Sequence, residues 1–139
     1  MAMNSGRLIS QHALANGLIL ELWDHSRPVA GDRWYVSLST RIAVPVRADT
    51  LPPELKALAE QVVTALGDEI IFTRKEERNF ISAAEFPVLL QEMQDRVLKL
   101  APGYFGHPDF AAKFIQGKFA ERQKLEHWQR LDTRRDSAG

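Results

Sequence analysis

The stretch that decides the fold is residues 7–25, with the sequence RLISQHALANGLILELWDH. Apolar residues flank Asn16-Gly17 on both sides, and both residues of this dipeptide tolerate the positive φ of a type I′ hairpin turn. The pattern therefore predicts a β-hairpin with strands near residues 7–15 and 18–25. Because a two-residue turn fixes the register, His12 is expected opposite Glu21.

Working outward, residues 34–44 alternate polar and apolar side chains until Pro45, which predicts a third strand after a connection at residues 26–32. Residues 70–81 are also rich in β-formers, but their middle is charged on both faces. Such charge is typical of an edge strand. We expect a three-stranded antiparallel meander and a fourth, edge strand whose neighbour the sequence leaves open.

Three helices are expected after or between these strands. The first follows Asp49-Thr50 and ends at Gly67, and the second begins between Ser82 and Phe86. Ala101-Pro102-Gly103 stops the second helix, and the third starts near Pro108. The fold class predicted is α+β, with the helices packed mainly on one face of the sheet. Residues 1–139 are expected to form a single domain, with residues 1–6 and 133–139 frayed.

Composition narrows the function classes. Eighteen Lys and Arg side chains balance eighteen Asp and Glu side chains, so no global field favours nucleic acid or an anionic membrane. The absence of cysteine excludes disulfides, thiolate metal sites and cysteine nucleophiles. No signal peptide or bilayer-spanning run is recognisable, so a soluble, cytoplasmic protein is expected.

The predicted register divides the hairpin and the third strand into two faces. The residues on the core side are Ile9, Gln11, Ala13, Leu20 and Leu22. The outer face collects an imidazole, a carboxylate, two aromatic rings, hydroxyls and a guanidinium, contributed by Ser10, His12, Glu21, Trp23, Tyr35, Ser37 and Arg41. On this face Ser10 is expected opposite Trp23, and Arg41 toward the hairpin end. Tyr35 is expected near Trp23.

If the apolar row of the third strand lies on the same side of the sheet as that of the hairpin, Ser37 is expected near Glu21.

Three functions fit this outer face. A carboxylate beside an imidazole can orient a general base, which would give a small enzyme with His12 as base, Glu21 as orienting group and Arg41 as anion clamp. Exposed rings beside an arginine can stack nucleic-acid bases, although the acidic residues nearby oppose phosphate binding.

The interpretation we prefer is a non-enzymatic binding or assembly module, either a homo-oligomer or bound to a protein partner. Its binding residues would be Ser10, Trp23, Tyr35, Ser37 and Arg41, whereas an ordinary cross-strand pair explains His12 and Glu21 without catalysis. No two of the four histidines have a metal-site spacing, and Gly117-Lys118 lacks the rest of a phosphate-binding loop. We therefore expect neither a metal nor a cofactor.

Overall fold

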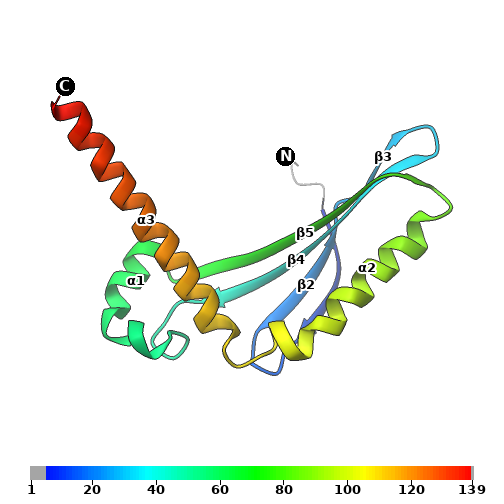
Figure 1. The fold of residues 1–139 in the computed structure, drawn as a ribbon. Coiled ribbons are helices and arrows are strands. Elements are labelled where there is room, and N and C mark those ends of the chain that lie inside the picture. Colours follow the sequence, from blue (N-terminus) through cyan, green and yellow to red (C-terminus); the bar gives the residue numbers. More distant parts are fainter. Residues whose placement is uncertain (1–5, 139) are drawn as a thin grey trace. The chain divides into compact units, whose positions relative to one another are not determined.

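The computed structural model describes the backbone of residues 6–138 and the side chains of residues 6–133. Residues 1–5 and 139, within the segments predicted to fray, lie outside the described residues. The elements are β1 (Arg7–Ala13), β2 (Ile19–Asp24), β3 (Arg27–Ala30), β4 (Arg33–Pro45), the 3-10 helix η1 (Pro53–Leu58), α1 (Ala59–Leu66), β5 (Glu69–Ser82), α2 (Phe86–Leu100), the π-helical turn η2 (Ala101–Phe105) and α3 (Phe110–Ala138) (Figure 1). The predicted α+β class is confirmed.

All five strands belong to one antiparallel sheet. β1 pairs with β2, and both β2 and β3 pair with β4. β5 also pairs with β4, and the amide of Ala83 bonds to the carbonyl of Asp32 at one end of this pair. β4 is thus the neighbour of β5 that the sequence left open.

The prediction of a simple connection at residues 26–32 is wrong, because part of this segment forms strand β3. The amide of Ser26 donates to Asp24 Oδ1 at 2.9 Å, and the amide of Ser37 donates to Ser26 Oγ at 3.0 Å. These side-chain bonds carry the chain past an irregularity, after which it pairs with β4 again. Gly31, at φ 55°, then makes the tight reversal into β4.

The turn between β1 and β2 is longer than predicted. The amide of Leu14 donates to the carbonyl of Leu18 at 2.8 Å, which encloses a three-residue turn rather than a two-residue one. Gly17 has a φ of 89°, as expected for the left-handed residue that completes such a turn. Asn16 Oδ1 accepts a hydrogen bond from the amide of Leu18 at 3.1 Å.

The longer turn slips the register of β1 by one residue. His12 lies opposite Leu20, and Gln11 lies opposite Glu21. The predicted opposition of His12 and Glu21 is therefore wrong, as is that of Ser10 and Trp23, because a one-residue slip moves each side chain to the other face. Gln11 and Ala13, predicted to face the core, are exposed.

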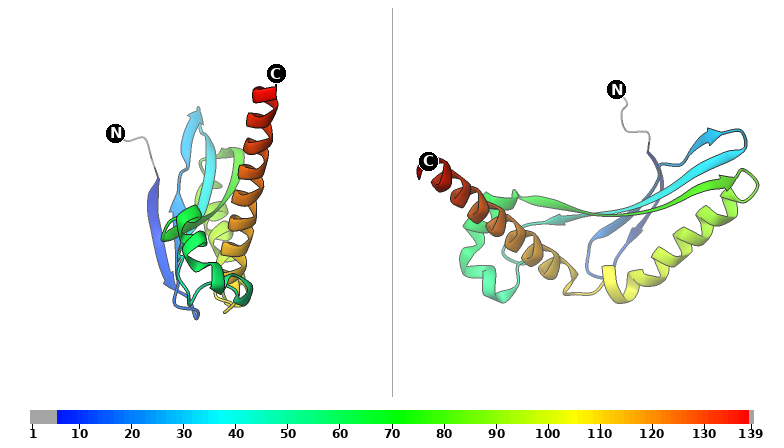
Figure 2. Two further views of the ribbon diagram at one scale, coloured as in Figure 1. Left: turned by 90° about the vertical axis from the view of Figure 1, so that its left-hand side faces the viewer. Right: turned by 45° about the horizontal axis from the view of Figure 1, so that its top comes forward.

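The described chain packs as two compact units, residues 6–43 with 71–108 and residues 44–70 with 109–138. In the first unit α2 covers one face of the strands, as Figures 1 and 2 show. Trp34 stacks on Phe86 at the start of α2, with ring centres 4.6 Å apart. The buried apolar residues of this core are Leu18, Leu20, Leu22, Val36, Leu38, Ile42, Leu90, Met93, Val97, Ala101 and Phe105. Leu20 and Leu22 thus face the core as predicted.

α2 ends at Leu100, directly before Ala101-Pro102-Gly103, as predicted, but a further helical turn follows it. The chain continues as η2, where the amide of Gly106 donates to the carbonyl of Ala101 at 2.7 Å, five residues back. The β1–β2 turn is tied to this segment, since Asn16 Nδ2 donates to the carbonyls of Phe105 at 2.9 Å and His107 at 3.1 Å.

The second unit is built on the packing of α1 against the first half of α3. Its buried apolar residues are Val44, Val46, Leu51, Val62, Phe110, Ile115 and Phe119. Between Ala120 and Thr133 every α3 side chain is exposed or half-buried. The apolar packing of α3 within its unit therefore ends near Phe119.

Candidate functional site

The outer face is the side of β1, β2 and β4 opposite to Leu20 and Leu22. Trp23 lies on β2, the middle strand of the three, opposite Ser39 on β4 and Leu8 on β1. Leu8 reaches this side because a bulge between Leu8 and Ser10 shifts the alternation of β1. We define the outer face by the residues Leu8, Gln11, Ala13, Ile19, Glu21, Trp23, Ser39 and Arg41.

Polar contacts hold the Trp23 ring in place. The indole Nε1 donates to Glu21 Oε1 at 2.9 Å, and the Arg41 guanidinium carbon lies 5.9 Å from the ring centre. Gln11 Nε2 donates to the other Glu21 oxygen at 3.4 Å. Glu21 and Arg41 are directly opposed across β2 and β4, so a carboxylate and a guanidinium flank the indole.

Apolar side chains lie at both ends of the outer face, on either side of the row of Gln11, Glu21 and Arg41. Ile19 is 52% exposed and Leu8 is 40% exposed, whereas Trp23 is half-buried. Ser39 is buried, so its hydroxyl adds little to the surface. The outer face therefore has an aromatic and aliphatic surface with one charge of each sign beside its centre.

Ser10 and His12 lie on the other side of β1. They are opposite Leu22 and Leu20, and the Ser10 hydroxyl is 3.0 Å from His12 Nε2. The carboxylate of Glu21 is hydrogen-bonded to Trp23 and Gln11 instead of an imidazole. The register thus removes the contact by which Glu21 was expected to orient His12.

Tyr35 and Ser37 are also displaced from their predicted neighbours. Tyr35 lies opposite Arg27, whose guanidinium carbon is 5.1 Å from the centre of the tyrosine ring. Ser37 is fully buried, away from any surface contact. Of the predicted binding residues, Trp23 and Arg41 are brought together, and Glu21 joins them.

The structure contains a second polar cluster that was not predicted from the sequence. The Tyr35 hydroxyl donates to Glu77 Oε2, and Lys75 Nζ lies 3.4 Å from the same oxygen. The Tyr35 hydrogen bond, helped by the charge of Lys75, lowers the pKa of Glu77 below 4.5. The charge of Glu77 in turn raises the pKa of Lys75 above 10.5. Only the pairing of β5 with β4 could have revealed this cluster.

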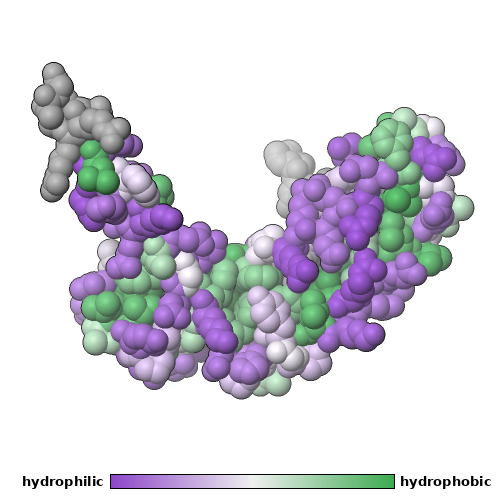
Figure 3. All heavy atoms as spheres, in the orientation of Figure 1, coloured by the Kyte–Doolittle hydropathy of each residue, from purple (hydrophilic) through white to green (hydrophobic). Residues whose placement is uncertain are grey.

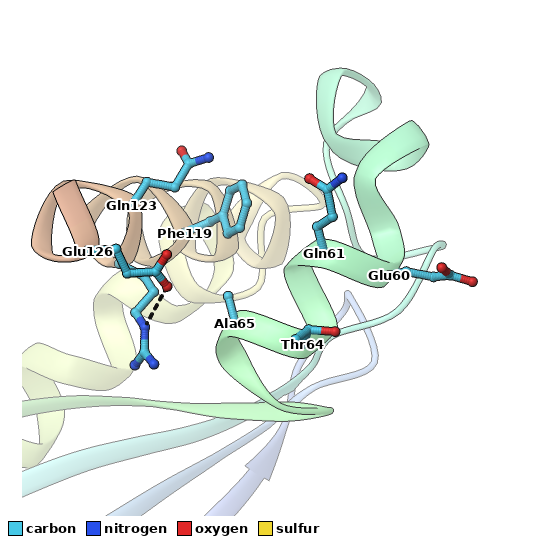
Figure 4. A pocket seen from close by; sticks show the side chains of 8 residues that line it. Glu60, Gln61, Thr64, Ala65, Phe119, Gln123 and Glu126 are labelled. Carbon is cyan, nitrogen blue, oxygen red and sulfur yellow. Dashed lines mark hydrogen bonds and ion pairs between the residues drawn. The ribbon is translucent and has the colours of Figure 1, made fainter. Parts of the chain in front are cut away.

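The second unit has an open groove of about 550 Å³ between α1 and α3. Figure 4 shows side chains from both helices along it, with Arg122 and Glu126 joined as an ion pair of 3.3 Å. The lining residues are Glu60, Gln61, Thr64, Ala65, Phe119, Arg122, Gln123 and Glu126. Charged and amide groups dominate this lining, and nothing in it forms a nucleophile–base pair.

Within the described part of the chain, no group of three or more His, Asp or Glu side chains is placed to hold a metal ion. No helix of residues 6–138 combines the length and apolarity needed to cross a bilayer. Comparison of the chain with protein-family models, curated proteins and solved structures finds no match.

Proposed function

We propose that this protein is a non-enzymatic assembly module whose outer face binds the outer face of a second copy of the chain. The observation that carries the proposal is the position of Trp23, which Glu21 and Arg41 hold on the middle strand of a face that also exposes Leu8 and Ile19. Tryptophan and arginine at the centre of a patch are the residue types that dominate protein–protein binding energy.

The charges favour a second copy as the occupant. Glu21 and Arg41 are neighbours on one face, so two copies related by a two-fold axis can place each carboxylate against the partner's guanidinium. A single-stranded nucleic acid would find only one positive charge here, beside a carboxylate. The face is therefore better suited to its own copy than to a polyanion.

The arrangement also favours assembly over catalysis. A general base requires an oriented partner and a cavity that holds the substrate. The contacts of Glu21 are to an indole and an amide, and His12 is on the opposite side of its strand. We therefore expect no activity that depends on these two side chains acting together.

The test is the concentration dependence of the molecular mass, measured by sedimentation equilibrium for wild type, Trp23→Ala and Ile19→Lys. Loss of the Trp23 ring is expected to weaken association by about 2 kcal/mol, or about 30-fold in Kd. Ile19→Lys alters a side chain that is already 52% exposed, so it weakens association without threatening the fold.

Val88→Ala is the matched control, because Val88 is an exposed apolar residue of α2 rather than of the outer face. Its mass curve should follow that of wild type. An Ile19→Lys curve that coincides with wild type, at concentrations where wild type associates, would overturn the proposal. A wild type that stays at the mass of a single chain at every concentration would do the same.

A further inference from the structure

The described part of α3 beyond Phe119 is a helix without apolar burial of its own. Every side chain from Ala120 to Thr133 is exposed or half-buried, whereas Ile115 and Phe119 are buried against the second unit. An isolated helix of this length is marginally stable in water, since most helical stability comes from packing one face. This segment therefore lacks the apolar packing surface that ordinarily stabilises a helix of this length.

Its apolar side chains form one stripe. Leu125 and Trp128 are 52% and 53% exposed, and Leu131 follows three residues later. At about 100° per residue, these three positions fall within one side of the helix. Figure 3 shows hydrophobic residues interrupting an otherwise hydrophilic surface along α3.

The stripe lies opposite to the side of α3 that packs within the second unit. Phe119 precedes Trp128 by about two and a half turns, which places the two side chains on opposite sides of the helix. Arg122 and Glu126, on the Phe119 side, line the groove with α1. The contact with α1 thus leaves the stripe of Leu125, Trp128 and Leu131 uncovered.

Two copies of the stripe match each other when the helices run in opposite directions. In an antiparallel pair centred on Trp128, Leu125 meets Leu131 of the second copy and Trp128 meets its own equivalent. Lys124 and Asp132 flank the stripe at equal distances from Trp128 and therefore meet each other, twice in the pair. A parallel pair would instead set Lys124 against Lys124 and Asp132 against Asp132.

We propose that α3 binds α3 of a second copy in an antiparallel two-helix contact through Leu125, Trp128 and Leu131. The contact is isologous, with a two-fold axis at Trp128 and two Lys124–Asp132 ion pairs at its rim. It uses a surface of the second unit, so it does not depend on the proposed role of the outer face. Together, the two interfaces would join copies at both units.

The test is a charge-reversal cycle in the full chain, followed by sedimentation equilibrium. Lys124→Asp and Asp132→Lys each replace two attractions by two repulsions, so each should raise the dimer Kd about tenfold or more. The double variant restores opposite charges and should return to within about threefold of wild type. Arg130→Asp, a similar loss of charge and helix propensity away from the stripe, is the matched control and should leave the Kd unchanged.

The measurements are made in an Ile19→Lys background, which removes the outer-face contact, and circular dichroism checks the helix content. If the outer-face proposal fails, the charge-reversal cycle still tests the α3 contact, because the cycle measures only the energetic coupling between Lys124 and Asp132. If the double variant is no tighter than the single variants, or if the Ile19→Lys protein remains at the mass of one chain at every concentration, the inference is wrong. Trp128→Ala with an undiminished dimer would also contradict it.

Discussion

Asn16 should be the most important polar side chain for stability in the first unit. Its amide nitrogen donates to the carbonyls of Phe105 and His107, and its oxygen accepts from the amide of Leu18. Each neutral hydrogen bond contributes about 1 kcal/mol net, and the bond to Leu18 is local and re-forms in part in the unfolded chain. Asn16→Ala is therefore expected to lower the free energy of unfolding by about 2–3 kcal/mol.

Asn16→Asp separates the hydrogen bonds that Nδ2 donates to Phe105 and His107 from the one that Oδ1 accepts from Leu18. The carboxylate keeps the acceptor for Leu18 but points a negative charge at two carbonyl oxygens, so at neutral pH it should destabilise at least as much as Asn16→Ala. Urea unfolding with linear extrapolation measures both variants. An Asn16→Ala loss below about 0.5 kcal/mol, the lower end for a single such bond, would refute the docking of the turn on residues 105–107.

Further predictions concern burial, strain and titration. Leu22→Ala should lower the unfolding free energy by about 3 kcal/mol because Leu22 is fully buried, and Ile19→Ala by less than about 1 kcal/mol; equal losses in urea unfolding would contradict the assigned faces. Phe80 is 69% exposed at a φ of 55°, so Phe80→Asn should raise the midpoint of urea unfolding through a gain of about 1 kcal/mol, and a loss would argue against backbone strain there. Tyr35→Phe should raise the pKa of Glu77 toward 4.5 in a carboxyl NMR titration, and an unchanged pKa would exclude the hydrogen bond. Because the folded-state pKa is lowered, this contribution to stability is present above 4.5 and is lost as the pH falls through the lowered pKa.

The faces of β2 and β4 could be predicted because each strand carries large apolar side chains at alternate positions, which all face the core. Leu20 and Leu22 on β2 alternate with polar or aromatic neighbours, and Val36 and Leu38 do the same on β4. The charged middle of β5 likewise identified it as a strand at the edge of the sheet. Such local patterns require no knowledge of distant residues.

The candidate site depended on information that is not local. Asn16-Gly17 suits a two-residue turn, but it also suits a three-residue turn with Gly17 as the left-handed residue. Asn16 binds carbonyls of residues that follow it by 89 and 91 positions, and these contacts accompany the longer turn. The register of β1, and with it the face of His12, could not be read from residues 7–25 alone.

Trp23 and Arg41 were expected on the outer face, and they lie there, because β2 and β4 depend on their own alternation. The opposition of Glu21 and Arg41 was not foreseen, because it depends on the register between β2 and β4, which are separated in the chain by β3. Ser37 was placed on the correct strand, but its complete burial depends on what packs over it. The faces of β2 and β4 follow from their own alternation, whereas the face of β1 and the pairings between strands depend on contacts elsewhere in the fold.

The most direct test of the assembly account is hydroxyl-radical footprinting of the three tryptophans at several protein concentrations. Trp34, which stacks on Phe86 inside the first unit, serves as the internal reference. The account predicts that oxidation of Trp23 slows as the concentration rises, both in wild type and in Lys124→Asp, while oxidation of Trp34 stays constant. A Trp23 oxidation rate independent of concentration would contradict it.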